Sequence, residues 1–113
     1  MNLEQQTCSA SIGRTLLSGR EIDGLLVQVP GWLLSGRELR REFKLKNFRQ
    51  AMELVNNVAS IANEQDHHPD IHISYNRVTL VLSTHSIGGL SLNDFILAAR
   101  VNLLLEKNAE KAA

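Results

Sequence analysis

Three of the four histidines in this chain of 113 residues lie where regular secondary structure is expected to end. His67 and His68 come directly after a predicted helix, and His85 comes directly after a predicted strand. Side chains at the ends of neighbouring elements can converge on one rim of a domain. Because histidine titrates close to neutral pH, several histidines around a cleft could supply both a general acid and a general base.

Two other interpretations compete with acid–base chemistry. The helix dipole favours a histidine at a helix C-terminus, and Pro69 is an ordinary stop signal, so helix termination alone could explain His67 and His68. A metal site of His68, His72 and His85 is the third interpretation. Adjacent histidines seldom share a metal, and no thiolate or well-placed carboxylate completes the set. Taken by themselves, the histidines fit helix termination best and a metal centre least.

Caps, turns and hydrophobic periodicity predict the secondary structure around these histidines. The predicted elements are a short helix from the Ser18–Glu21 capping box to about residue 29, strands at 32–35 and 39–45, a helix at 47–65, strands at 71–75 and 78–82, and a helix at 91–106. This order contains no βαβ crossover. It predicts an α+β two-layer domain, with a four-stranded antiparallel sheet and three helices on one face, in the order α-β-β-α-β-β-α.

Apolar stripes predict which faces of these elements are buried. The helix at 47–65 has one stripe, formed by Phe48, Met52, Val55, Ala59 and Ala62. The last helix has two, with Leu92, Phe95, Ile96, Ala99 and Leu103 on one side and Leu97, Val101, Leu104 and Leu105 nearly opposite. A helix on one face of a sheet buries a single stripe, so we expect the second stripe to mediate a homo-oligomer.

In the strands, alternation predicts one buried face for the second hairpin, formed by Ile71, Ile73, Tyr75, Val78, Leu80 and Leu82. In the strand at 39–45, Arg41 interrupts the apolar side.

Composition limits the class of protein. Twelve basic and twelve acidic residues give a formal net charge of zero, which leaves no global field for a nucleic-acid backbone or an anionic membrane. No apolar run approaches a membrane span, and no signal peptide is visible. The single cysteine, Cys8, fits a reducing compartment, so we expect a cytoplasmic protein. We expect one domain at 18–106, a flexible extension at 1–17 and a flexible tail at 107–113.

Several short segments together resemble the pterin-4a-carbinolamine dehydratase family. They are Asp66 to Asp70 (Asp-His-His-Pro-Asp), Tyr75 and Asn76, Leu82 to His85 (Leu-Ser-Thr-His), and Gly89, Leu90 and Asp94. The resemblance covers roughly residues 21 to 103. A His-His-Pro element combined with a Thr-His element at this separation is specific, so the combination favours a functional interpretation of the histidines over helix termination.

The resemblance implies a reaction and a site. The family removes water from 4a-hydroxytetrahydropterin and gives quinonoid dihydropterin, with neither a metal nor a redox cofactor. By resemblance, His67 and His85 would be the acid–base residues, and His68 would orient the pterin and share in proton transfer. The remaining pocket residues would be Asp66, Ser83, Thr84 and Ser86.

One departure from the family pattern bears on activity. The family usually carries an acidic residue four positions before the first histidine, where this chain has Asn63. Glu64 follows directly, but a shift of one residue turns a side chain by about 100° around a helix, so Glu64 cannot simply replace that acid.

Two functions therefore remain. The first is a dehydratase, and the alternative is a non-catalytic family member that acts as a protein-binding co-regulator or assembly factor. The resemblance also implies a homodimer through sheet edges or a homotetramer through helices.

Overall fold

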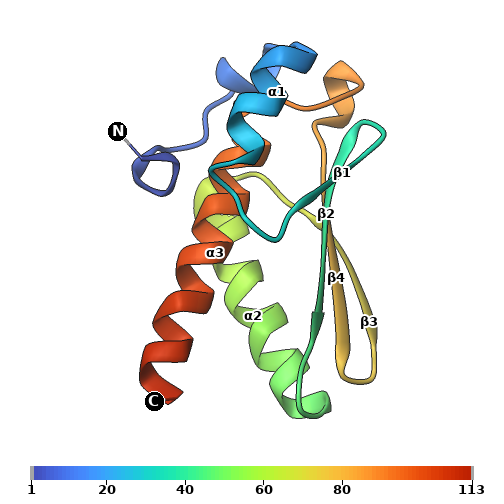
Figure 1. Cartoon of the computed structure of the whole chain (residues 1–113), viewed down its shortest axis with the longest axis vertical. Helices are drawn as coiled ribbons and strands as arrows, with labels where there is room; N and C mark the ends of the chain where they lie inside the picture. Colours follow the sequence, from blue (N-terminus) through green and yellow to red (C-terminus); the bar gives the residue numbers. More distant parts are fainter. Residues whose placement is uncertain (1, 113) are drawn as a thin grey trace.

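The computed structural model describes residues 2–112, and the side chains of residues 2–106. The main elements are α1 (Gly19–Leu26), β1 (Leu33–Ser35), β2 (Glu38–Lys44), α2 (Phe48–Gln65), β3 (Asp70–Ser74), β4 (Arg77–Leu82) and α3 (Leu92–Ala112) (Figure 1). Three single-turn 3-10 helices complete the set, η1 (Leu3–Gln5), η2 (Ile12–Arg14) and η3 (His85–Ile87).

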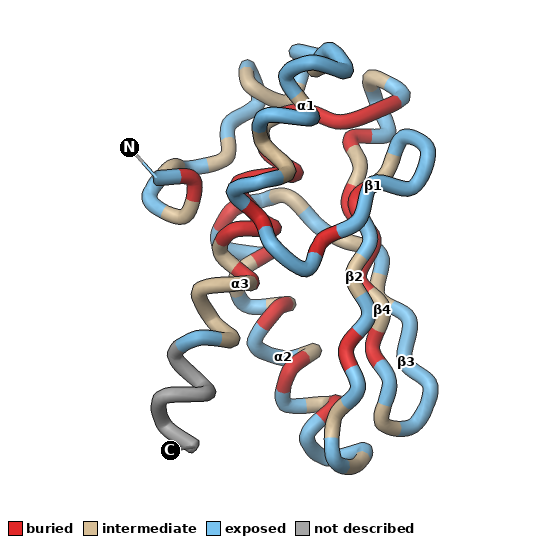
Figure 2. The backbone as a smooth tube through the Cα atoms, in the orientation of Figure 1, coloured by how far each residue is buried: buried red, intermediate tan, exposed pale blue. Residues whose placement is uncertain are grey.

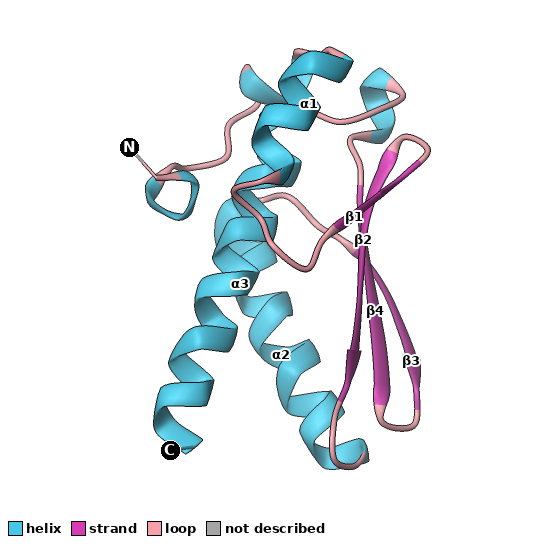
Figure 3. Cartoon of the chain, viewed as in Figure 1, coloured by secondary structure: helices cyan, strands magenta, loops and turns pink. Residues whose placement is uncertain are grey.

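The four strands form one antiparallel sheet in the order β1-β2-β4-β3. The long helices α2 and α3 lie on one side of this sheet, and no helix among residues 2–112 lies on the other side (Figure 3). The predicted α+β two-layer fold and its element order are confirmed. The layers bring the C-terminal end of β4, the start of α3 and the end of α2 near one another, in the upper half of the molecule as drawn in Figure 1.

Two helix starts follow from their caps. The Ser18 hydroxyl accepts from the Glu21 backbone N–H at 3.2 Å, and the Glu21 carboxylate accepts from the Ser18 N–H at 3.0 Å, which is the predicted capping box. The side chain of Asn47 accepts from the Gln50 N–H at 2.9 Å and starts α2. Helix α1 is three residues shorter than predicted, because the backbone turns after Leu26 ahead of Pro30.

The buried face of α2 differs from the predicted one. The buried residues are Ala51, Leu54, Val58, Ala62 and Gln65, whereas Phe48 is half exposed. Only Ala62 of the predicted stripe is fully buried, and Met52, Val55 and Ala59 lie at its half-buried edge. An apolar stripe can be wider than the contact that covers it, and here the positions of α3 and the sheet decide which edge faces the core (Figure 2).

Helix α3 buries both of its apolar sides over its first half. Phe95, Ile96 and Leu97 are inaccessible to solvent, and Val101 is 1% exposed. Leu97 and Val101 belong to the stripe that was expected to mediate a homo-oligomer. That stripe is covered within the chain, because η1 packs against α3 and places Leu3 in the same core cluster. Leu103, Leu104 and Leu105 are only half-buried. The helix continues past residue 106 through most of the predicted tail, whose side chains lie outside the described residues.

The second hairpin is buried on one strand only. Val78, Leu80 and Leu82 of β4 are fully buried, whereas Ile73 and Tyr75 are 40% and 65% exposed. Strand β3 is an edge strand, and no residue of it is buried. The predicted burial is confirmed for β4 and wrong for Ile73 and Tyr75, because the helices do not extend over that edge. Ile71 is half-buried and packs against the core.

Arg41 faces the helices and is accommodated by polar partners. Its guanidinium donates to the Asn102 side-chain oxygen at 2.5 Å and to the Pro30 carbonyl at 3.2 Å, and it lies 4.8 Å from the centre of the Phe43 ring. Partial burial lowers the pKa of Arg41. The interruption of the apolar alternation is therefore a contact to α3.

The N-terminal segment lies along α3. Leu3 is buried, Arg100 donates to the Gln6 carbonyl, and the Asn93 side chain exchanges two hydrogen bonds with the backbone of Ser9, at 3.1 and 2.8 Å. Flexibility of residues 1–17 concerns motion in solution and stays a prediction. Within the described residues, none of the helices combines the length and apolar character needed to cross a membrane.

Candidate active site

A buried carboxylate links α2, β4 and α3 at one end of the domain. Asp94 is inaccessible to solvent, and its Oδ1 lies 2.6 Å from Nε2 of His67. Its Oδ2 accepts from the Thr84 hydroxyl at 2.8 Å and from the Ser91 backbone N–H at 2.9 Å. The Thr84 and Ser91 hydroxyls are themselves 2.8 Å apart. One side chain therefore caps α3, holds the end of β4 and positions a histidine.

The end of α2 directs His67 toward Asp94. Asp66 takes a left-handed conformation with φ 51°, which ends the helix. The His67 N–H then reaches back to the Ala62 carbonyl at 3.2 Å. The side chain of His67 is 13% exposed. Since a carboxylate is the acceptor, Nε2 of His67 donates and Nδ1 is left for other contacts.

His68 has a different partner. Its Nε2 lies 3.0 Å from Oδ1 of Asn63, in the last turn of α2. The residue is exposed, and the following proline favours an extended backbone at this position. The chain therefore carries an amide beside His68 and a carboxylate beside His67.

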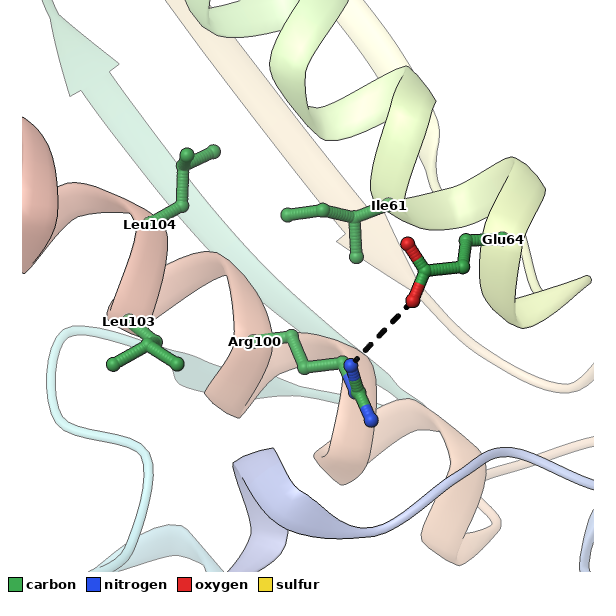
Figure 4. Close-up of a pocket in the computed structure, with 5 residues that line it drawn as sticks. All are labelled: Ile61, Glu64, Arg100, Leu103 and Leu104. Carbon is green, nitrogen blue, oxygen red and sulfur yellow. Dashed lines mark ion pairs between the residues drawn. The ribbon is translucent and has the colours of Figure 1, made fainter.

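Glu64 turns to the other side of α2. Its carboxylate lies 4.0 Å from Nη1 of Arg100 on α3, and the two side chains face one another across a groove that Ile61, Leu103 and Leu104 also line (Figure 4). This geometry agrees with the expectation from helix rotation that Glu64 does not take the place of an acid at position 63.

His85 lines a cavity beyond the end of β4. The cavity has a volume of about 350 Å³ and is lined by Arg37, Glu38, Ser83, His85, Gly88 and Gly89. Thr84 has an extended backbone, so its side chain and those of its two neighbours point to opposite sides. Thr84 points inward to Asp94, and Ser83 and His85 face the cavity.

The structure brings some of the predicted site residues together and separates others. His67 is joined to Thr84 through Asp94, and His85 follows Thr84 in the chain. Ser83 and His85 share one cavity, and Asp66 lines a different one of about 250 Å³ with Cys8 and Asn93 among its other residues. Ser86 is exposed on η3.

The sequence interpretation missed two contacts. Asp94 was given as part of the family resemblance but not as a partner of His67, because His67 lies 27 residues earlier in the chain. Asn63 was identified as the residue that replaces the usual acid of the family. Its hydrogen bond to His68 was not predicted, because that contact depends on the turn after α2. Among residues 2–106, no group of three or more histidine, cysteine, aspartate or glutamate side chains is arranged to hold a metal ion.

Comparison with known proteins identifies the family. The family model described as "Pterin 4 alpha carbinolamine dehydratase" matches residues 15–104. The chain belongs to the pterin-4a-carbinolamine dehydratase family. A relative from Chromobacterium violaceum, named "Putative pterin-4-alpha-carbinolamine dehydratase", is 41% identical over 107 residues, which are 95% of this chain and 99% of the relative. A relative of the same name from Nitrosospira multiformis is 48% identical over 90 residues, 80% of each chain.

Solved structures agree with this family assignment. The fold matches the crystal structure of a "transcriptional coactivator/pterin dehydratase" from Brucella melitensis with a TM-score of 0.75 and 34% identity, over 80% of this chain and 98% of that one. A pterin dehydratase-like protein, described as a RuBisCO assembly factor in the alpha-carboxysome, matches with a TM-score of 0.53 over 65% of this chain and 84% of that one. Its identity is 22%, so this second match shows likeness of fold alone.

Proposed function

We propose that this member of the pterin-4a-carbinolamine dehydratase family catalyses the loss of water from 4a-hydroxytetrahydropterin to give quinonoid dihydropterin. The observation that supports the proposal best is the chain of hydrogen bonds from His67 through buried Asp94 to Thr84, directly before His85 and its cavity. A histidine oriented by a carboxylate is a common arrangement for proton transfer.

The proposed chemistry needs two proton transfers. The bond between ring carbon 4a and the hydroxyl oxygen breaks, and an acid protonates that oxygen so that water leaves. The neighbouring ring nitrogen loses its proton to a base, and its electron pair forms the new carbon–nitrogen double bond. We assign these roles to His67 and His85, on different sides of the pterin, without dividing acid from base.

The other predicted residues have supporting roles in this proposal. His68 orients the pterin and shares in proton transfer, and Asp66, Ser83 and Ser86 contribute to binding. The hydroxyl of Thr84 is occupied by Asp94 and Ser91, so Thr84 contributes through its backbone or by holding Asp94. The reaction needs no redox cofactor, since the loss of water neither oxidises nor reduces the pterin overall.

The reaction can be tested directly. Rapid mixing can follow the decay of the 4a-hydroxytetrahydropterin that an aromatic amino-acid hydroxylase produces. We expect micromolar protein to accelerate this decay over the buffer rate. A decay rate equal to the buffer rate would refute the dehydratase function. It would favour the alternative, a protein-binding co-regulator or assembly factor in the cytoplasm.

A further inference from the structure

We propose that Asn63 is a positioning residue that fixes His68 as the tautomer protonated on Nε2, so that Nδ1 carries the lone pair and accepts a proton. The inference starts from the 3.0 Å contact between Nε2 of His68 and Oδ1 of Asn63. A neutral imidazole has one donor nitrogen and one acceptor nitrogen, and an amide oxygen can only accept. Nε2 must therefore donate, and the proton is absent from Nδ1.

The position of the ring leaves Nδ1 open for chemistry. His68 is exposed, and within the described part of the chain its Nδ1 makes no hydrogen bond. Pro69 restricts the backbone before it, so the ring is held from both the side chain and the main chain. An acceptor nitrogen is thus presented to solvent or to a bound molecule in a defined orientation.

A comparison with His67 shows how the neutral amide of Asn63 differs from a carboxylate as a partner for histidine. Asp94 beside His67 brings a negative charge that can balance a protonated ring, whereas the amide of Asn63 brings none for His68. The two neighbouring rings therefore differ in the charge of the group that orients them. The role of His68 in proton transfer depends on the proposed dehydratase function. The tautomer of His68 is independent of that function.

The test measures the tautomer and the turnover separately. Long-range ¹H–¹⁵N correlation spectra of ¹⁵N-labelled protein, recorded at mildly alkaline pH, identify the protonated nitrogen of each histidine ring. We expect Nε2–H for His68 in the wild type and in Asn63→Asp, which keeps an acceptor oxygen. Asn63→Leu removes the acceptor, and its His68 should show a mixture of both tautomers.

Turnover should follow the tautomer. Asn63→Leu should lower kcat by about fivefold, the effect of one lost neutral hydrogen bond, with little change in KM. Asn63→Asp should retain more activity than Asn63→Leu. Asn57→Leu is the matched control, because Asn57 is an exposed asparagine on the same helix, and it should change neither the spectrum nor kcat.

Two results would overturn the inference. One is a wild-type His68 protonated on Nδ1, and the other is an Asn63→Leu spectrum in which His68 is unchanged. A wild-type protein that shows the expected tautomers but does not accelerate dehydration would support the positioning by Asn63 and refute the proposed function.

Discussion

His67 and His68 are adjacent in the chain but are oriented by groups of different charge, Asp94 and Asn63. If His67 and His85 transfer the two protons, His67→Ala and His85→Ala should each lower the dehydration rate by about 10²-fold or more. Rapid-mixing kinetics on each variant, with circular dichroism to check the fold, measure this effect. His72→Ala is the control, because His72 is exposed on β3, and it should keep wild-type turnover. Wild-type turnover in His85→Ala would show that this role is assigned wrongly.

Asp94 is expected to contribute to stability as well as to orientation. Its two oxygens accept from His67, Thr84 and Ser91, and an amide in its place would turn an N–H group toward one of these donors. We expect Asp94→Asn to lower the free energy of unfolding by about 2 kcal/mol, the cost of an unsatisfied buried polar group. Urea unfolding measures it, with the exposed Asp70→Asn as the control. Equal stability of the two variants would contradict the network.

At the scale of elements, the N-terminal segment determines the environment of Cys8. The Cys8 N–H donates to the Gln65 side chain at 3.0 Å, and its thiol lies 3.6 Å from the Asn93 carbonyl. Burial raises the pKa of Cys8 from 9.0 to about 11, an effect that the charge of Arg100 partly opposes. The thiolate is the reactive form, so in the packed conformation less of the thiol is reactive at any pH below about 11.

The reaction of Cys8 with a thiol reagent tests this packing. A cysteine whose pKa is about 11 carries about 100-fold less thiolate at mildly alkaline pH than one whose pKa is 9.0. We therefore expect the folded protein to react about 100-fold more slowly than the urea-unfolded chain at the same pH. Equal rates would show that the segment leaves α3 readily, as the predicted flexible extension requires.

The whole molecule leaves several apolar side chains exposed. Ile73 lies on the edge strand β3, Tyr75 lies in the turn that follows it, and Leu104 and Leu105 are half-buried on the second half of α3. We propose a homodimer or homotetramer that covers these surfaces, as the family resemblance implies. The proposal no longer rests on Leu97 and Val101, which the chain covers itself.

Light scattering tests the assembly. We expect the wild type to be an oligomer at tens of micromolar, and Tyr75→Lys or Leu104→Glu to reduce its order, because a charge at an interface opposes burial. Val27→Glu, in the loop after α1, should leave the order unchanged. Val101→Glu is unsuitable, since it would place a charge in the core. A monomeric wild type would refute the proposal.

The amino-acid sequence was enough to predict the fold class, the order of the elements and the capping box at Ser18, because capping hydrogen bonds and period-2 or period-3.6 patterns act between residues close in the chain. It also marked the family through the segments around His67 and His85, which the family match over residues 15–104 confirms.

The contacts that orient the histidines and the choice of covered apolar faces became visible in the three-dimensional arrangement alone. Asp94 meets His67 across 27 residues, and the N-terminal segment reaches Asn93 across 84, so no local spacing encodes either contact. The same holds for the buried edge of α2 and for the second stripe of α3. An apolar pattern indicates that a face can be buried, and the arrangement of the neighbouring elements in space decides whether it is.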